Sequence, residues 1–90
     1  MRINKSEETT VVNVRTSKCD VYIGRPSKWG NPFRIGPDGT REQVIAKYRR
    51  YASRFTEADL KEFNGKRLGC FCHPLPCHGD VLAELANGLK

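Results

Sequence analysis

Apolar residues along this chain predict three short strands. Residues 10–14 and 20–23 are rich in β-branched and aromatic side chains, and residues 67–71 form a third short apolar run after a long interval. Residues 1–9 are polar and show no period. We therefore expect a flexible N-terminal arm at residues 1–9, followed by a single compact domain at residues 10–90.

Between the second and third strands the apolar residues take up a helical spacing. Thr40 and Gln43 fit a capping box, in which the hydroxyl accepts a backbone N–H and the glutamine reaches back. The amphipathic stripe that follows consists of Val44, Tyr48, Tyr51 and Phe55. A shorter helix is expected over residues 56–65, and a last helix over residues 80–87.

This order of elements predicts a small α/β or α+β domain with about three strands and a C-terminal helix. The second strand, the helical pair and the third strand form a β-α-β unit, whose two strands run parallel with a right-handed crossover. Parallel strands end at one edge of the sheet, so the loops after residues 23 and 71 are expected to lie side by side. Ligands of open α/β sheets bind outside this edge.

Composition and charge narrow the classes of function. The 90 residues contain no apolar run near the ~18 residues of a membrane span, and the N-terminus has no apolar signal-peptide core. We expect a cytoplasmic protein without membrane contact. Sixteen Lys and Arg against ten Asp and Glu give a net charge of +6. Such an excess attracts nucleotides, nucleic acid or an acidic protein, although it also serves solubility.

Three of the four cysteines are clustered with both histidines within nine residues. Clustered thiols and imidazoles in a reducing compartment indicate a metal site first. The preferred zinc ligands are Cys70, Cys72, Cys77 and His78, with His73 as the alternative fourth ligand. A structural Zn²⁺ takes four such ligands, and a domain this small gains stability from it. A metal-free loop with a reactive thiol, a catalytic zinc and buried inert cysteines remain alternatives.

Asp80 follows this cluster and has two interpretations. In the first turn of a helix, its carboxylate complements the helix dipole, which is the more common role. Beside His78 it is also a candidate catalytic acid or base, with His73 as a second candidate.

The loop at residues 24–33 combines groups that bind an anion and a base. The candidate substrate-binding residues are Arg25, Ser27, Lys28, Trp29 and Asn31. A guanidinium, an ammonium and a hydroxyl together suit a phosphate. Trp29 can stack on a base, although a lone tryptophan in so small a chain is more simply a core residue. Asn31 is a candidate for reading a base edge or for ordering a catalytic water.

These two loops resemble a known family. Residues 21–33 (VYIGRPSKWGNPF) and 69–80 (GCFCHPLPCHGD) are similar to the domain of unknown function 4326, which occurs largely in phages and bacterial genomes. The resemblance spans residues 12–86. It implies a compact α/β domain in a phage-type context, hence the cytoplasm of a bacterial host, and it favours His78 over His73 as a ligand. It implies no particular reaction.

Two classes of function follow. The first is an enzyme or binding protein for a nucleotide, nucleoside or nucleic acid, with residues 24–33 holding the ligand beside residues 70–80, and with Asp80 and Asn31 as catalytic candidates. The second is a non-enzymatic phage accessory module that binds nucleic acid or a host protein through a basic helix face. That face consists of Arg41, Lys47, Arg49, Arg50 and Arg54. Two unusual loops at one sheet edge favour the first class.

Overall fold

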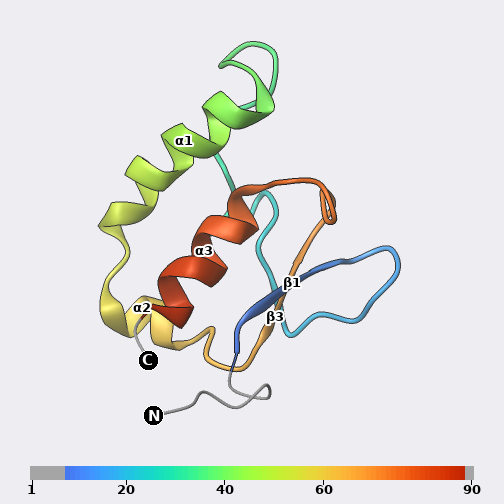
Figure 1. The fold of residues 1–90 in the computed structure, drawn as a ribbon, viewed down its shortest axis with the longest axis vertical. Coiled ribbons are helices and arrows are strands. Elements are labelled where there is room, and N and C mark those ends of the chain that lie inside the picture. Colours follow the sequence, from blue (N-terminus) through green and yellow to red (C-terminus); the bar gives the residue numbers. More distant parts are fainter. Residues whose placement is uncertain (1–7, 89–90) are drawn as a thin grey trace.

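Three short parallel strands form one sheet in the order β1-β3-β2 (Figure 1). The computed structural model describes residues 8–88. The strands are β1 (Thr10–Asn13), β2 (Val21–Tyr22) and β3 (Arg67–Cys70). Both outer strands run parallel to the central strand β3. The parallel pairing of β2 with β3 confirms the predicted β-α-β arrangement.

The strands lie where the sequence predicts them but are slightly shorter. Val14 and Ile23, the predicted ends of the first two strands, each keep one backbone hydrogen bond to β3. Val14 N–H donates to the Cys70 carbonyl at 3.0 Å, and Ile23 N–H donates to the Gly69 carbonyl at 3.0 Å. The chain then leaves both strands at the carboxyl edge, as expected.

Helical segments fill the interval between β2 and β3 and follow β3. They are α1 (Arg41–Tyr51), the 3₁₀ turn η2 (Ala52–Arg54), α2 (Glu57–Lys61) and α3 (His78–Asn87). The predicted capping box of α1 is present. Thr40 Oγ1 accepts from Gln43 N–H at 3.2 Å, and Gln43 Oε1 accepts from Thr40 N–H at 2.8 Å.

α3 begins two residues before its predicted start. Cys77 caps it, because its Sγ accepts the N–H of Gly79 at 3.3 Å. In return, Asp80 Oδ2 accepts the N–H of Cys77 at 3.1 Å. This start has no sequence signature, because cysteine is not among the usual N-cap residues.

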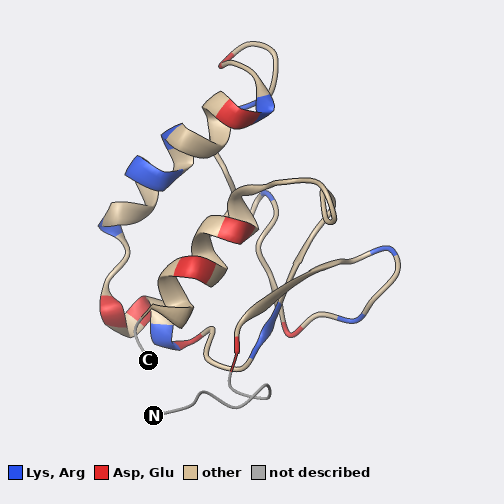
Figure 2. Ribbon diagram, viewed as in Figure 1, with Lys and Arg blue, Asp and Glu red and all other residues tan. Residues whose placement is uncertain are grey.

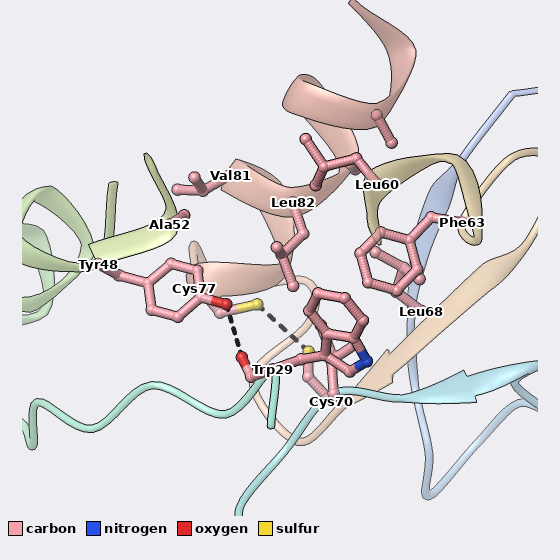
Figure 3. Close-up of a cluster of buried hydrophobic side chains, with 13 residues drawn as sticks. Trp29, Tyr48, Ala52, Leu60, Phe63, Leu68, Cys70, Cys77, Val81 and Leu82 are labelled. Carbon is pink, nitrogen blue, oxygen red and sulfur yellow. Dashed lines mark hydrogen bonds between the residues drawn. The ribbon is translucent and has the colours of Figure 1, made fainter. Parts of the chain in front are cut away.

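The core forms where α3 lies between α1 and the sheet (Figures 1 and 3). Trp29 packs edge-on against Phe55 and Phe63, with ring centroids 4.8 and 4.5 Å apart. Tyr48 is fully buried, and its hydroxyl donates to the Trp29 carbonyl at 2.6 Å. The loop after β2 is thereby fixed to α1, which defines its position beside the sheet edge.

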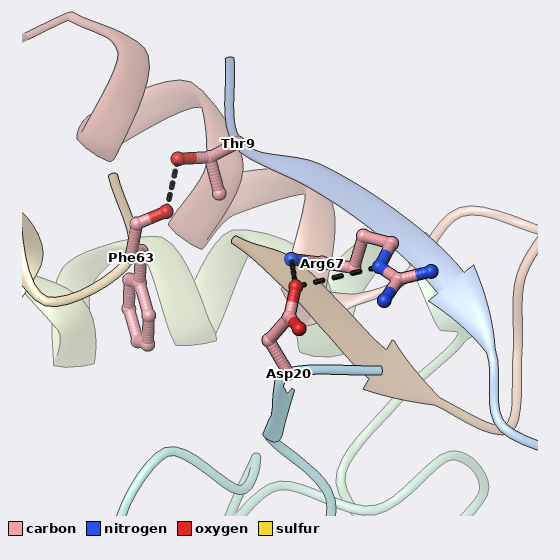
Figure 4. Close-up of polar contacts among 4 residues, drawn as sticks. All are labelled: Thr9, Asp20, Phe63 and Arg67. Carbon is pink, nitrogen blue, oxygen red and sulfur yellow. Dashed lines mark hydrogen bonds and ion pairs between the residues drawn. The ribbon is translucent and has the colours of Figure 1, made fainter. Parts of the chain in front are cut away.

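The start of β1 is fixed to the end of α3 and to the segment before β3. Thr9 is buried, and its hydroxyl donates to the Phe63 carbonyl at 2.6 Å (Figure 4). Its N–H donates to Asn87 Oδ1 at 2.8 Å, and Asn87 Nδ2 donates to the Thr9 carbonyl at 3.0 Å. Of the predicted flexible arm, residues 1–7 lie outside the described residues. Within residues 8–88, no helix is both long and apolar enough to span a membrane.

Candidate functional site

A cavity of about 550 Å³ opens where the chain leaves β2 and β3. Three segments form its walls: the loop after β2, the first turns of α1 and the loop between β3 and α3. The expectation that the two unusual loops lie side by side is therefore confirmed. Parallel pairing of β2 and β3 produces this neighbourhood, since both strands end at the same edge.

The polar part of the cavity is cationic. Arg25, Arg34 and Arg41 line it, and no Asp or Glu is among its lining residues. Arg41 Nη1 donates to the carbonyl of Pro76 at 3.0 Å, which links α1 to the loop before α3. Within the part of the chain that the structure describes, the guanidinium groups of Arg25 and Arg34 have neither a hydrogen bond nor an ion pair. The cavity therefore has unneutralised donors for an anion.

The remaining wall is largely apolar. Tyr22 and Phe71 meet edge to face, with ring centroids 6.1 Å apart, at the ends of β2 and β3. Both rings are exposed, Tyr22 by 38% and Phe71 by 53%. Phe33 and Ile35 line the cavity from the loop before α1. Such a wall can accept a flat apolar group next to the arginines.

Asn31 lines the cavity, but its amide is also a structural bridge. Its Oδ1 accepts the N–H of Phe33 at 2.9 Å, and its Nδ2 donates to the Val44 carbonyl at 3.3 Å. The side chain thus attaches the loop to α1. One Nδ2 proton and one oxygen lone pair remain for a ligand.

The other residues predicted to bind a substrate make structural contacts within the protein. Ser27 Oγ donates to the Gly24 carbonyl at 2.6 Å, within a turn. Lys28 lies 3.7 Å from Asp59 and 4.5 Å from the centroid of the Trp29 ring. Trp29 belongs to the core. Of these residues only Arg25 and Asn31 line the cavity.

Two of the residues that line the cavity, Cys70 and Cys77, have their thiols in contact (Figure 3). Cys70 Sγ and Cys77 Sγ are 3.3 Å apart, and both residues are buried. The hydrogen bond from Cys77 lowers the pKa of the Cys70 thiol against the opposing effect of burial, with help from the N–H groups of His73 and Cys72. The same contact, together with burial, raises the pKa of Cys77.

The two histidines have different surroundings. His78 lines the cavity; its Nε2 lies 2.7 Å from the Ile23 carbonyl, and its ring contacts Tyr48 edge-on at 5.0 Å. Burial lowers the pKa of His78. The carbonyl contact requires Nε2 to carry the proton. His73 does not line the cavity, and its backbone carbonyl accepts from Asn13 Nδ2 at 2.8 Å.

Comparison with known proteins identifies the family. The family model described as "Domain of unknown function (DUF4326)" matches residues 4–88. The chain belongs to this family. It is 41% identical over 86 residues to the "Uncharacterized 12.4 kDa protein in nrdA-td intergenic region" of Enterobacteria phage T4, covering 88% of this chain and 78% of the relative. It is 36% identical over 104 residues to the "Uncharacterized protein R718" of Acanthamoeba polyphaga mimivirus, covering 94% and 76%. No solved structure matches.

The zinc ligand set predicted for this DUF4326 domain does not converge on one point. Among residues 8–88, no three His, Cys, Asp or Glu side chains form a group that could hold a metal ion. Cys70 and Cys77 are in contact, but Cys72 and His78 would have to turn towards them, and His78 Nε2 is occupied by the Ile23 carbonyl. Zinc binding by these four residues stays a prediction.

Asp80 is exposed and is not among the residues that line the DUF4326 cavity. Its carboxylate completes the capping box of α3 through Cys77 N–H. This contact is the structural role that the sequence analysis weighed against a catalytic one. The catalytic role of Asp80 stays a prediction, and its side chain has no contact with the cavity.

The sequence analysis did not assign Arg34 or Phe71 to a site, and it placed Arg41 on a different surface. All three line the cavity. Arg41 is the first residue of α1, at the end of the segment that connects the unusual loop to this helix, and this position is the available signal. The positions of Arg34 and Phe71 depend on how the loops fold back, which has no local signature.

Proposed function

We propose that this DUF4326 domain binds a nucleotide in the cavity between residues 24–35 and 70–78. The single observation that carries the proposal is the set of three arginines, Arg25, Arg34 and Arg41, around one cavity without a lining carboxylate. The phosphate lies among the guanidinium groups and the base lies against the aromatic wall.

Guanidinium groups suit this task because their planar donors match phosphate oxygens in pairs. Arg41 uses one donor on the Pro76 carbonyl, which orients the side chain and leaves its other donors available. The guanidinium groups of Arg25 and Arg34 have no internal hydrogen bond or ion pair among the described residues. A phosphate thus gains charge-assisted hydrogen bonds without breaking an existing ion pair.

The apolar wall supports a nucleotide over inorganic phosphate. Aromatic side chains bind bases by stacking, and Tyr22, Phe33 and Phe71 present rings to the cavity. The volume of about 550 Å³ lies in the range of small-molecule sites. Asn31 retains hydrogen-bonding capacity for a base edge or a ribose hydroxyl. A conversion of the bound nucleotide, and the cytoplasm of a bacterial host as its location, stay predictions.

The basic face of α1 is less suited to be the main binding surface (Figure 2). Arg49 pairs with Glu84 at 2.7 Å, although both side chains are more than half exposed. Lys47 donates to the Asp38 carbonyl at 2.7 Å. Arg54 stacks over a tyrosine ring. An acidic partner would compete with these internal contacts, whereas a phosphate in the cavity would not.

Calorimetric titration of the full chain tests the proposal. The ligands are the four common nucleoside 5′-monophosphates, inorganic phosphate and a short single-stranded oligonucleotide. Arg25→Gln should weaken binding of the best mononucleotide by about tenfold, since loss of one charge-assisted contact costs about 1.5 kcal/mol. Arg50→Gln, which removes the same charge from α1, should change affinity by less than about twofold.

Equal losses in the two variants would assign binding to the helix face, and no binding of any mononucleotide at millimolar concentration would overturn the proposal. Tight binding of the oligonucleotide alone would also contradict a mononucleotide site. Chromatography of the nucleotide after incubation reports any conversion.

A further inference from the structure

We infer that Cys70 and Cys77 form a dithiol–disulfide couple that exchanges with a small anionic disulfide entering the cavity. Their sulfur atoms are 3.3 Å apart, whereas a disulfide bond is about 2.05 Å long. The two atoms therefore need to approach by little more than about 1 Å. This inference rests on the thiol pair and is independent of nucleotide binding.

The pair joins two elements that are already packed together. Cys70 is the last residue of β3 and Cys77 is the N-cap of α3. α3 packs on β3 and β1 in the core, so a bond between the cysteines follows an existing contact. The intervening residues 71–76 form an exposed to half-exposed loop that can adjust to the bond.

The other two cysteines are placed differently. All four are free thiols, and Cys19 and Cys72 are half-buried. Cys72 lines the same cavity, whereas Cys19 lies against the backbone of Gly69. Within residues 8–88, no other pair of cysteines is in hydrogen-bond contact. Proximity thus selects Cys70 with Cys77, and Cys72 is the matched control.

Access and charge both favour a substrate from the cavity. Cys70 and Cys77 are buried, but both are among the lining residues, so the cavity is the route to their sulfurs. The three arginines at the same cavity attract a disulfide that carries carboxylates. Oxidised glutathione has this chemistry, and cystamine is a disulfide of opposite charge.

The exchange balances in two steps. One cysteine attacks a sulfur of the substrate R–S–S–R; a protein–SR disulfide forms, the substrate S–S bond breaks, and the released thiolate takes up the proton of the attacking thiol. The second cysteine then attacks the protein sulfur of the mixed disulfide and releases the second R–S⁻, which takes up the second proton. Two electrons pass from the protein to the substrate, giving two R–SH and the Cys70–Cys77 bond. A dithiol reductant reverses the process.

The test equilibrates the full chain with glutathione at graded ratios of oxidised to reduced form, quenches with acid and alkylates the remaining thiols. Mass spectrometry should show two alkylation sites lost together in wild type and in Cys72→Ser, and peptide mapping should identify residues 70 and 77. Cys70→Ser should lose the internal bond and stop at the mixed disulfide. Cys77→Ser should do the same while keeping the helix cap, because serine is a good N-cap.

Charge preference is measured separately. Oxidised glutathione should react faster than cystamine, and Arg25→Gln should reduce this preference several-fold. Circular dichroism of each variant serves as the control for folding.

Three results would overturn the inference. The first is full alkylation of both cysteines at every glutathione ratio, and the second is a disulfide that includes Cys72. The third is one bound zinc per chain that protects the pair until a chelator is added, which would support the metal prediction instead. None of these results affects nucleotide titration of the reduced protein, so the two proposals fail independently.

Discussion

Cys77 holds a position at which helices usually carry a hydroxyl or an amide. Its thiol accepts the N–H of Gly79, while Asp80 accepts the N–H of Cys77. Sulfur is a weak acceptor, and serine would cap the helix better. The cap therefore does not explain why a thiol stands there. What a thiol adds at this position is the contact with Cys70.

Asp80→Ala should separate the capping role from the catalytic one. Loss of the hydrogen bond to Cys77 N–H and of the favourable charge at the helix start should lower the free energy of unfolding by about 1 kcal/mol. Nucleotide affinity should stay within about twofold, because Asp80 does not line the cavity. Urea denaturation and calorimetry measure the two effects. A folded variant with no affinity or no activity would restore the catalytic interpretation.

Asp20 should make stability depend on pH in the acid range (Figure 4). Its Oδ2 accepts from Arg67 N–H at 2.8 Å and from Arg67 Nε at 3.3 Å, and these bonds lower the pKa of Asp20 below its usual 3.8. A lowered pKa in the folded state stabilises the fold above pH 3.8, and this contribution is lost as pH falls through the lowered pKa. Melting temperatures of wild type and Asp20→Asn should therefore differ near neutral pH and converge below pH 3.8. Parallel curves at all pH values would contradict this.

At the scale of elements, the sheet depends on the close approach of the loop between β1 and β2 to the backbone of β3. Gly69 lies in the middle of β3, opposite Val12 on one side and Tyr22 on the other. A Cβ at this position would lie 2.5 Å from Cys19 Sγ and 2.6 Å from Val14 Cγ1. The loop between β1 and β2 thus packs directly on the backbone of the central strand.

Gly69→Ala should destabilise the domain by about 1–3 kcal/mol, the usual cost of overpacking. Adding Cys19→Ala should recover part of this loss, because it removes the nearest atom. Chemical denaturation of both variants and of Cys19→Ala alone measures the recovery. No recovery would show that the strain lies at Val14 Cγ1 or at Cys19 Cβ, which alanine retains 2.7 Å from the new Cβ.

Local signals explain which elements the sequence predicts correctly. The capping box of Thr40 and Gln43 predicts the start of α1. The strand segments are rich in β-branched and aromatic residues and are flanked by turns. The start of α3 was predicted two residues late because a thiol cap has no common signature. The cavity is predictable only in part: topology places the loops together, but Arg34 and Phe71 reach it through the way the loops fold back.

At the scale of the whole molecule, three of the sixteen Lys and Arg side chains line the cavity, and no Asp or Glu does. Nucleotide affinity should fall as sodium chloride is raised, because salt screens the field of Arg25, Arg34 and Arg41. Arg25→Gln should show a shallower dependence on salt than wild type, and Arg50→Gln should keep most of it. Calorimetry at several salt concentrations measures the slopes. Affinity independent of salt would argue against a phosphate contact.

The bonds of Thr9 to Asn87 and Phe63 have a practical consequence for handling this domain. They hold the start of β1 beside the end of α3 (Figure 1). The cavity instead opens at the carboxyl edge of the strands and at the start of α3. Residues 8 and 88, the two ends of the described chain, thus lie on the side away from the cavity. An affinity tag or a surface tether joined beyond these residues should therefore leave the cavity open.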